Sequence, residues 1–227
     1  MTLPPSTDCH DLFFLNVQSI RSHHDQLEVL VSEIGQPTIL VLCETWLTIN
    51  NPIGLFNLKS YQQILTCNRG TQKGGGLAFY VREGVNFATS HLDLKLEHFI
   101  LSIVLNGKHL NICAVYRPPN GKIADFLDDL EDLVFELKSR RGSMVMCGDF
   151  NLNTINPDDT NVKNYLDLLG SFDLQVINKE PTRVRATQVI NDIKWSSTCI
   201  DHFISDDDYE VETIKTTISD HFAIKLI

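Results

Sequence analysis

The hydrophobic residues of this chain fall into short runs that end at polar, glycine or proline residues, as in "LFFLNV" (12–17) and "TILVLCE" (38–44). Short apolar runs bounded by turn residues are typical of buried β-strands. The dipeptide Asn106-Gly107 separates two such runs and predicts a tight hairpin between them. Further strands are predicted at 74–81, 98–105, 109–116, 144–147, 197–205, 209–216 and 221–227.

Longer segments carry apolar residues at the spacing of one helical face. Between residues 22 and 35 the apolar positions recur at this spacing, and Gly35 follows as a stop signal. The acidic segment 123–140 has the same pattern and predicts an amphipathic helix. A shorter helix is predicted near 162–170.

The order of these elements predicts an α/β fold in which two mainly antiparallel sheets pack face to face, with helices outside. The chain has 227 residues, of which 43% are apolar, so we expect a single domain over 1–227 with one substantial core. No apolar run approaches the ~20 residues that span a bilayer. The N-terminal segment also lacks the basic and apolar regions of a signal peptide. We therefore expect no membrane partner.

Charge and cysteine usage narrow the class of protein. The formal net charge of −10 argues against a protein that coats nucleic acid by bulk electrostatics, although a catalytic domain can still gather its basic residues on one face. The six cysteines show no Cys-x-x-Cys spacing, and Cys43, Cys113 and Cys147 lie inside apolar runs. We interpret them as reduced thiols of an intracellular protein.

Polar residues recur at the ends of the predicted strands. In "SMVMCGDFNLNT" (143–154) we expect a buried strand over 144–147, a glycine that ends it, and Asp149 and Asn151 emerging together at its carboxyl end. One strand-end polar residue is often a turn former, but recurrence at several strand ends predicts a constellation of functional side chains. The other members are Asn16, Glu44, Tyr116, Asp201 with His202, and Asp220 with His221.

These residues stand in motifs that resemble the endonuclease/exonuclease/phosphatase superfamily, in the same order and over nearly the whole chain. The motifs are Asn16, "CETW" (43–46), "VYRPP" (115–119), "GDFN" (148–151), "IDHF" (200–203) and "SDH" (219–221). Within the superfamily, "NVQSIRS", "CETWL", "YRPPN" and "PTR" resemble the apurinic-type endonuclease domain of non-LTR retrotransposons of Jockey-like clades. The resemblance implies a four-layer α/β sandwich, a divalent metal ion and hydrolysis of a phosphodiester bond.

The resemblance and the chemistry of phosphodiester hydrolysis assign roles to the acidic and amide side chains. Glu44 would be the principal ligand of Mg²⁺, or of Mn²⁺, because a hard cation prefers carboxylate oxygen. Asn16 would support the metal or the scissile phosphate, and Asp220 would complete the metal shell or hold the catalytic loop. Asp149 would orient or deprotonate the attacking water, while Asn151 donates to a phosphate oxygen. A cap or ion pair for Glu44, and an Asx-turn for Asp149 and Asn151, are the structural alternatives.

Histidine, tyrosine and arginine side chains complete the expected site. His221 would contact the scissile phosphate, with Asp201 fixing the tautomer of its imidazole and stabilising its charged form. Tyr116 would hydrogen-bond the phosphate. Arg117 would pair with Tyr116 or with a neighbouring phosphate, or else lock its own loop through a salt bridge. His202 points to the opposite face from Asp201 if their strand is regular, so we interpret it as structural.

A late basic segment is the first candidate for DNA contact, because specificity usually comes from loops. This segment, "PTRVRATQVINDIKW" (181–195), carries Thr182, Arg183, Arg185 and Lys194 among turn residues. Similar enzymes use a hairpin near this position to probe the minor groove of DNA. A surface loop with incidental charges is an equal alternative for this segment.

A second candidate for contact with the DNA backbone is "CNRGTQKGGG" (67–76). It places Arg69 and Lys73 before glycines that would let a phosphate approach. The segment resembles no motif for nucleoside triphosphates, so triphosphate binding is not expected.

The sequence therefore predicts a Mg²⁺-dependent DNA endonuclease that nicks one strand of a double-stranded DNA target and leaves a 3′-hydroxyl that primes reverse transcription. The chain would be one domain excised from a longer polyprotein, with element RNA and a downstream reverse transcriptase as partners and the nucleus as the place of action. Two alternatives stay open: a phosphoesterase acting on inositol phosphates or lipids, and a non-catalytic DNA-binding module. The dipeptide Asp201-His202 favours the nuclease, because inositol phosphatases tend to carry Asp-Arg there.

Overall fold

Two six-stranded sheets form the centre of the molecule in the computed structural model, which describes residues 11–67, 70–71, 74–189 and 192–227. The strands of the first sheet are β1 (Leu12–Asn16), β2 (Ile39–Cys43), β3 (Leu65–Cys67), β4 (Leu77–Val81), β13 (Val211–Ile214) and β14 (Ala223–Leu226). Those of the second are β5 (Phe87–Ser90), β6 (Glu97–Leu105), β7 (Lys108–Tyr116), β8 (Ser143–Asp149), β9 (Gln175–Val176) and β12 (Asp201–Ser205).

The strand order is β13-β14-β1-β2-β4-β3 in the first sheet and β5-β6-β7-β8-β12-β9 in the second. The pairs β1–β2 and β7–β8 are parallel. The other neighbouring strands that the structure describes pair antiparallel. The two sheets are therefore mainly antiparallel, as expected.

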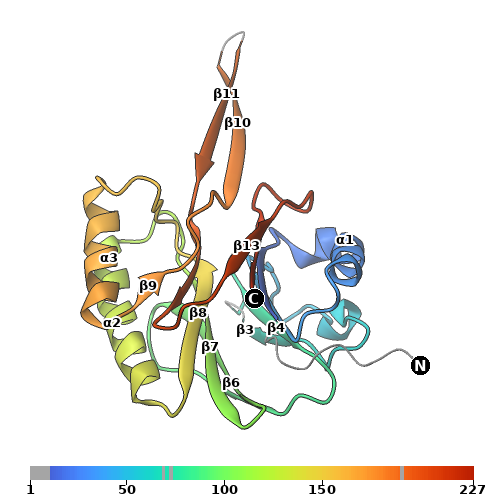
Figure 1. The fold of residues 1–227 in the computed structure, drawn as a ribbon. Helices are drawn as coiled ribbons and strands as arrows, with labels where there is room; N and C mark the ends of the chain where they lie inside the picture. The colour runs from blue at the N-terminus through green and yellow to red at the C-terminus, as the bar shows by residue number, and fades with distance from the viewer. Residues whose placement is uncertain (1–10, 68–69, 72–73, 190–191) are drawn as a thin grey trace.

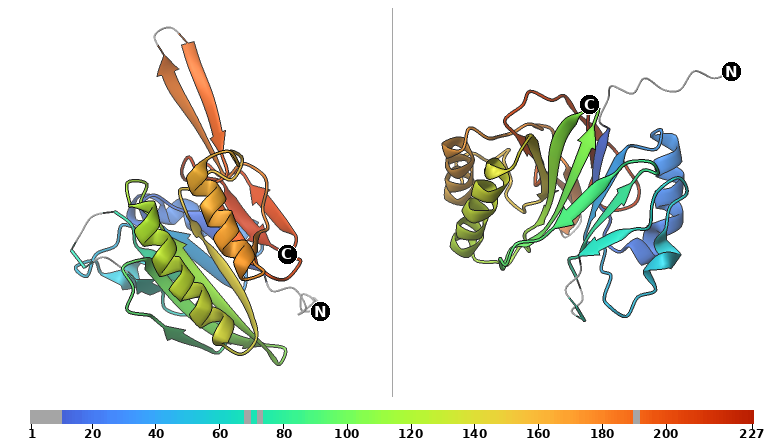
Figure 2. Two further views of the ribbon diagram at one scale, coloured as in Figure 1. Left: turned by 90° about the vertical axis from the view of Figure 1, so that its left-hand side faces the viewer. Right: turned by 90° about the horizontal axis from the view of Figure 1, so that it is seen from below.

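Helices cover the outer face of each sheet and complete a four-layer α/β sandwich (Figure 1 and Figure 2). The helices are α1 (Ile20–Glu33) and the 3₁₀-helix η1 (Ile53–Phe56) on the first sheet, and α2 (Ile123–Ser139) and α3 (Thr160–Ser171) on the second. Apolar side chains fill the space between the sheets and the spaces beneath the helices. The expected fold class is confirmed. Among the described residues, no helix is long and apolar enough to cross a membrane.

Two glycines were predicted to mark the ends of strands, and the structure confirms this for Gly107 but not for Gly148. The Asn106-Gly107 turn joins β6 to β7 as predicted, and both residues have positive φ, 50° and 78°. Gly148, by contrast, does not end its strand, because β8 continues to Asp149. A Cβ at Gly148 would overlap the carbonyl oxygen of Val115 on β7. Glycine here permits the close approach of two strands and does not mark a turn.

A hairpin projects from one end of the sandwich (Figure 1). It consists of β10 (Arg183–Val189) and β11 (Asp192–Thr198), which form a separate two-stranded sheet. The single strand predicted over 197–205 is therefore wrong in its extent. The chain leaves the hairpin at Thr198 and joins the second sheet at Asp201.

The strand directions bring the polar residues of the expected constellation to one edge of the sandwich. β1, β2, β7 and β8 end at this edge. Because β12 runs antiparallel to β8, its first residue, Asp201, lies opposite Asp149. Asp201 thus begins its strand and does not end it, which corrects the expectation without moving the residue to another edge. The segment 219–221 reaches the same edge because β14 runs antiparallel to β1.

Candidate active site

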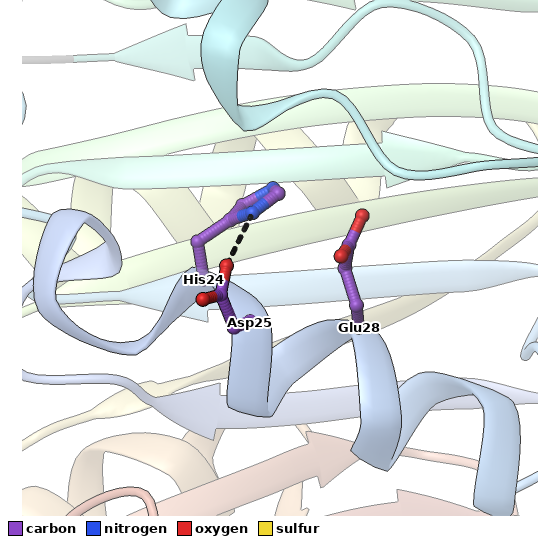
Figure 3. Close-up of side chains that lie close together, drawn as sticks. All are labelled: His24, Asp25 and Glu28. Atoms are coloured by element: carbon purple, nitrogen blue, oxygen red, sulfur yellow. Dashed lines mark ion pairs between the residues drawn. The ribbon is translucent and has the colours of Figure 1, made fainter.

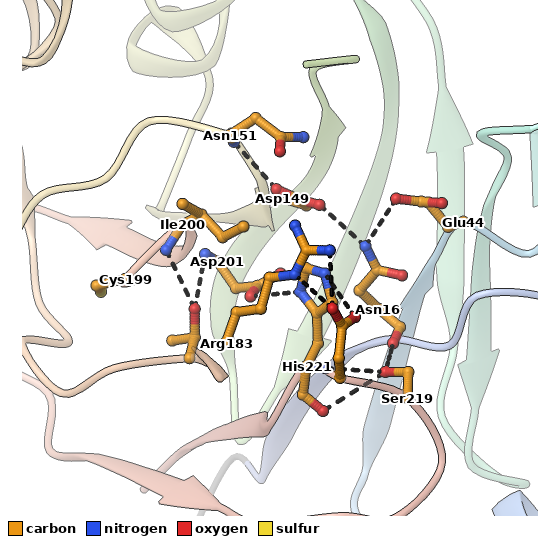
Figure 4. Close-up of polar contacts among 12 residues, drawn as sticks. Asn16, Glu44, Asp149, Asn151, Arg183, Cys199, Ile200, Asp201, Ser219 and His221 are labelled. Carbon is orange, nitrogen blue, oxygen red and sulfur yellow. Dashed lines mark hydrogen bonds and ion pairs between the residues drawn. The ribbon is translucent and has the colours of Figure 1, made fainter. Parts of the chain in front are cut away.

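Side chains from both sheets meet at this edge (Figure 4). In the second sheet, Tyr116, Asp149 and Asp201 are direct neighbours across β7, β8 and β12. Asp149 and Asp201 lie two residues from Cys147 and Phe203, which belong to the core between the sheets. Because side chains alternate along a strand, both carboxylates point into that space. Tyr116 is in the same core and is 6% exposed.

The amide of Asn16 links the two sheets. Its Nδ2 donates to Glu44 Oε1 at 3.0 Å and to Asp149 Oδ2 at 2.9 Å. Its Oδ1 accepts a hydrogen bond from the backbone N–H of Gln18 at 3.2 Å, and the side chain is fully buried. One amide therefore holds the carboxylates of Glu44 and Asp149 close to each other, which a simple turn residue would not do.

Glu44 follows β2 with a φ of 51°. A positive φ is uncommon for a residue other than glycine, and such residues cluster at functional sites. Its Oε2 accepts a hydrogen bond from Trp46 Nε1 at 3.1 Å, while Oε1 binds Asn16. Both carboxylate oxygens are thus oriented by neighbouring donors.

Asp149 is buried at the end of β8, with an exposed fraction of 1%. Its Oδ1 accepts from the backbone N–H of Asn151 at 3.0 Å, so the Asx-turn considered as an alternative is present. Asn151 Nδ2 donates to the carbonyl oxygen of Arg117 at 2.7 Å. Burial first, and then the charge of Asp201, raise the pKa of Asp149 to about 8. Without a bound cation, Asp149 therefore carries a proton at neutral pH.

His221 and Asp201 form the buried pair that the sequence predicts. His221 Nδ1 lies 2.8 Å from Asp201 Oδ2, and His221 is 1% exposed. Burial alone would lower the pKa of His221, but the charge and hydrogen bond of Asp201 raise it to about 9. The imidazole is therefore cationic at neutral pH. Its second nitrogen, Nε2, lies 3.7 Å from Asp220 Oδ1.

His202 points to the other face of β12, as strand alternation predicts. Its Nδ1 is 3.0 Å from the hydroxyl of Tyr165, and its ring stacks on Phe150 with centroids 5.2 Å apart. Burial lowers the pKa of His202 to about 4, so the ring is neutral. His202 is part of the core beneath α3.

The pKa shifts at this edge predict a stability that falls as the pH rises. A group whose folded-state pKa is raised stabilises the fold below its unfolded pKa, and this stabilisation is lost as the pH passes its folded pKa. That window runs from 3.8 to about 8 for Asp149 and from 6.5 to about 9 for His221. In EDTA, Asp149→Asn should flatten the decline by on the order of 1 kcal/mol per pH unit between about pH 5 and pH 7.5. Urea unfolding across this range measures it.

The exposed Asp208→Asn provides the control for this titration and should keep the wild-type slope. An Asp149→Asn protein whose unfolding free energy declines as steeply as that of the wild type would contradict the assigned protonation of Asp149.

The side chains at this edge fit a hard divalent cation. Atoms of Asp149, Asp201 and His221 all lie within 4.8 Å of one another, and of these the two carboxylates are the groups suited to a hard cation, because the imidazole is itself charged. Asp201 Oδ1 is buried and has no hydrogen-bond partner among the described residues, which leaves an acceptor free for a cation or its water. Glu44 adds a third carboxylate beside Asn16. Carboxylate oxygens are the ligands that Mg²⁺ and Mn²⁺ prefer in proteins.

Arg117, expected to contact Tyr116 or a phosphate, makes the loop-locking interaction instead. Its guanidinium group donates to the carbonyl oxygens of Phe150, Asn151 and Gly121 at 3.4, 3.3 and 2.9 Å. The residue is 7% exposed, and burial lowers its pKa. The lock is made through backbone carbonyls, whereas the sequence suggested a salt bridge.

Thr182, expected to contact DNA, is fully buried, so this expectation is wrong. Its Oγ1 accepts hydrogen bonds from the backbone N–H groups of Ile200 and Asp201 at 3.1 and 3.0 Å. Its own N–H donates to the carbonyl oxygen of Thr198 at 2.9 Å. Thr182 therefore fixes the start of β12, where Asp201 meets His221.

The remaining basic candidates differ in their surroundings. Arg185 and Lys194 are exposed on the hairpin and lie on one face, because Arg185 is opposite Ser196 and Lys194 is opposite Thr187. Arg183, at the base of the hairpin, forms an ion pair with Asp220. The other two candidates, Arg69 and Lys73, lie outside the described residues.

Three residues near the site were missed by the sequence reasoning. Gln18 Nε2 donates to Asp220 Oδ1 at 2.8 Å, and Trp46 donates to Glu44. Glu97, at the start of β6, accepts a hydrogen bond from the backbone N–H of Gly76. Gln18 and Trp46 stand inside the motifs "NVQSIRS" and "CETWL", which was the available signal. Glu97 had no comparable signal.

A second group of metal-type side chains lies on α1, outside the first sheet (Figure 3). It consists of His24, Asp25 and Glu28, of which Asp25 and Glu28 are exposed. His24 Nδ1 lies 4.0 Å from Asp25 Oδ1, and its ring meets the ring of Phe56 edge-on at 5.8 Å. Exposed acidic groups of this kind are common without a metal, so we assign no site to this group.

Comparisons with known proteins show the family and the fold of the chain. The sequence profile of the Endonuclease/Exonuclease/phosphatase family matches residues 14–221. No curated protein sequence matches the chain. Among solved structures, the chain is similar to the endonuclease domain of TRAS1, a telomere-specific non-LTR retrotransposon, with a TM-score of 0.74, 12% identity, and 96% and 97% of the two chains covered.

Two further solved structures have the same fold. For the AP endonuclease LMAP from Leishmania major the TM-score is 0.74 and the identity 13%, over 96% of this chain and 86% of that one. For the 3′-5′ exonuclease from Neisseria meningitidis they are 0.71 and 17%, over 96% and 98%. At such identities the likeness shows a shared fold.

Proposed function

The chain belongs to the endonuclease/exonuclease/phosphatase family, and from that premise we propose that it is a divalent-metal-dependent DNA endonuclease that nicks one strand of duplex DNA and leaves a 3′-hydroxyl. One observation carries this proposal. Carboxylates and a cationic histidine converge on one edge, at the base of a projecting hairpin that carries exposed cations (Figure 1).

Mg²⁺ or Mn²⁺ bound by Glu44, with Asn16 orienting that carboxylate, would neutralise charge on the scissile phosphate. Glu44 is suited to this because both of its oxygens are already oriented by the donors of Asn16 and Trp46. Asp220 fits the holding role better than the ligand role, since its oxygens face Gln18 and Arg183.

Asp149 and Asn151 are proposed to handle the attacking water and one phosphate oxygen. Asp149 has a raised pKa, and a carboxylate of this kind is a stronger proton acceptor than an exposed aspartate. A nearby cation favours its ionised form. Asn151 holds the Asp149 carboxylate through its backbone N–H, so the two act as one unit.

His221 is proposed to donate from Nε2 to a phosphate oxygen. Asp201 occupies Nδ1 and keeps the ring charged, which leaves Nε2 as the donor toward the substrate. A preorganised cationic donor stabilises the negative charge that builds up in phosphoryl transfer. Tyr116 ends β7, opposite Asp149 on β8, and would donate to the same phosphate.

Duplex DNA is proposed to lie along the hairpin. Two structures of the same fold were solved with DNA, the 3′ phosphatase NExo from Neisseria with a product DNA hairpin and TDP2 from D. rerio with a single-strand DNA product. Arg185 and Lys194 lie on one hairpin face, where they would contact phosphates and so position the DNA backbone. The DNA sequence would then be recognised through the shape of the groove.

Removing both exposed cations should weaken DNA binding. We expect Arg185→Ala/Lys194→Ala to lower the slope of log K against log salt by about two units, since each phosphate contact contributes roughly one. Its nick sites on a random DNA library should also shift. Fluorescence anisotropy across a salt series, together with sequencing of the nicks, provides the measurement.

The matched control for this variant is Lys108→Ala/Arg141→Ala, which removes two exposed cations at the opposite end of the second sheet. It should keep the wild-type slope and nick map. If the hairpin variant also keeps both, the hairpin is only a surface feature, and the DNA contact must be sought elsewhere.

A setting in a retrotransposon follows from the same proposal. A nick with a 3′-hydroxyl supplies a primer, so the partners would be element RNA and a reverse transcriptase, and the place of action would be the nucleus. The likeness to the TRAS1 endonuclease domain supports this setting.

A substrate panel tests the proposed function. The protein is incubated with Mg²⁺ and either supercoiled plasmid or an inositol polyphosphate. We expect open-circular DNA and no release of inorganic phosphate. Phosphate release without nicking would instead assign the site to a phosphoesterase of inositol phosphates.

A further inference from the structure

Arg183 is held at the base of the hairpin by a carboxylate of the active-site edge. Its Nε and Nη2 both lie 2.8 Å from Asp220 Oδ2. The other oxygen of Asp220 accepts from Gln18 Nε2 at 2.8 Å and lies 3.7 Å from His221 Nε2. Asp220 therefore stands between Arg183 and the ring nitrogen that faces the substrate.

The backbone around Arg183 is joined to the backbone around His221. The two residues form an isolated antiparallel bridge. On either side of it, Val184 N–H donates to the carbonyl oxygen of Asp220 at 3.2 Å, and Phe222 N–H donates to that of Thr182 at 2.6 Å. Directly opposite residues of an antiparallel pair project to the same side, so Arg183 and His221 face the same space.

We propose that Arg183 is a positioning residue, which holds Asp220 in place beside His221 and so couples the hairpin to the reacting atoms, and that it does not bind the DNA backbone. This inference rests on the proposed nuclease function. The charge of Arg183 is already compensated by Asp220, and its side chain is 27% exposed. A guanidinium group that is paired with a carboxylate attracts a phosphate less strongly than a free one does. Arg185, on the same hairpin face, is exposed.

Loss of Arg183 would release one oxygen of Asp220 from both of its arginine donors. The carboxylate, which is 30% exposed, can then rotate onto His221 Nε2 and occupy the donor intended for the phosphate. The expected result for Arg183→Ala is a fall of about 10-fold or more in kcat, with Kd for DNA and the salt slope of binding close to wild type.

The test is chemical rescue of Arg183→Ala by guanidinium ions. Nicking is measured at saturating DNA with low millimolar guanidinium chloride and, separately, with equimolar sodium chloride. We expect guanidinium to restore a measurable part of kcat, because the free ion can occupy the place of the lost side chain beside Asp220. Arg140→Ala is the matched control, since Arg140 also contacts a carboxylate, Glu136, but at the far end of α2. It should nick at the wild-type rate in both salts.

Three outcomes would overturn this inference. One is an Arg183→Ala protein with wild-type kcat and a salt slope lowered by about one unit, which would make Arg183 a DNA contact. Another is a loss of kcat that guanidinium does not restore. If Arg183→Ala does not fold, Arg183→Met replaces it, because methionine keeps much of the side-chain length and removes the charge; a lowered salt slope or an unchanged kcat in that variant counts against the proposal. An inactive wild-type protein, by contrast, would contradict the proposed nuclease function itself.

Discussion

The His221→Ala variant should nick DNA about 10²-fold or more slowly than the wild-type protein at saturating DNA. Nε2 of His221 is the proposed donor to the phosphate, and the pair with Asp201 keeps the ring charged. Alanine removes this donor and leaves the buried Asp201 carboxylate without its cation. Asp149→Ala should have an effect of similar size, because it removes the proposed acceptor for the proton of water.

Conversion of supercoiled plasmid under single-turnover conditions measures this loss. His109→Ala is the control, since His109 lies near the opposite end of β7 and should nick at the wild-type rate. Circular dichroism has to show that each variant is folded. A folded His221→Ala protein with the wild-type rate would remove His221 from the proposed chemistry.

The second large effect concerns the metal. We expect EDTA to abolish nicking and Mg²⁺ or Mn²⁺ to restore it. In Glu44→Gln, the metal concentration for half-maximal activity should rise by about 10-fold or more, because the amide lacks the charge that holds a hard cation. The single oxygen of glutamine can retain only one of the two hydrogen bonds, from Asn16 or from Trp46, and the fold should persist because Glu44 is only half-buried.

Titration of nicking with Mg²⁺ measures the metal dependence of activity. Titration of thermal stability with Mg²⁺, without DNA, measures metal binding separately. Glu83→Gln, which changes an exposed glutamate, should retain the wild-type metal dependence. Glu44→Gln with an unchanged half-activity concentration and an unchanged stabilisation by Mg²⁺ would place the cation on other ligands.

Much of the fold follows from local patterns in the sequence. The helical stripe of 123–140 is the buried face of α2, and the Asn106-Gly107 turn joins β6 to β7 because both residues adopt positive φ. The candidate site at one edge was predictable because its polar residues stand at or within a few positions of strand termini. The exception in detail was Gly148, whose role depends on the carbonyl oxygen of Val115 on a neighbouring strand. A contact between strands leaves no local signal.

The surroundings of single side chains could not be read in this way. Thr182, Arg183 and Arg117 all stand in basic or turn-rich segments, where an exposed contact with DNA is a natural interpretation. Their actual partners are distant in sequence: the N–H groups of Ile200 and Asp201 for Thr182, the carboxylate of Asp220 for Arg183, and backbone carbonyls for Arg117. Burial and pairing depend on how the two sheets and the hairpin meet, which the sequence does not encode locally.

The chemical group at the 3′ end of a nick tests the central proposal most directly. Supercoiled plasmid is nicked by the purified protein with Mg²⁺, and the open-circular product is offered directly to a DNA polymerase with a labelled nucleotide. We expect immediate incorporation of label, because hydrolysis leaves a 3′-hydroxyl, and no incorporation with the His221→Ala variant. Plasmid that stays supercoiled while bound by the wild-type protein, or nicks that are extended only after phosphatase treatment, would contradict the proposal.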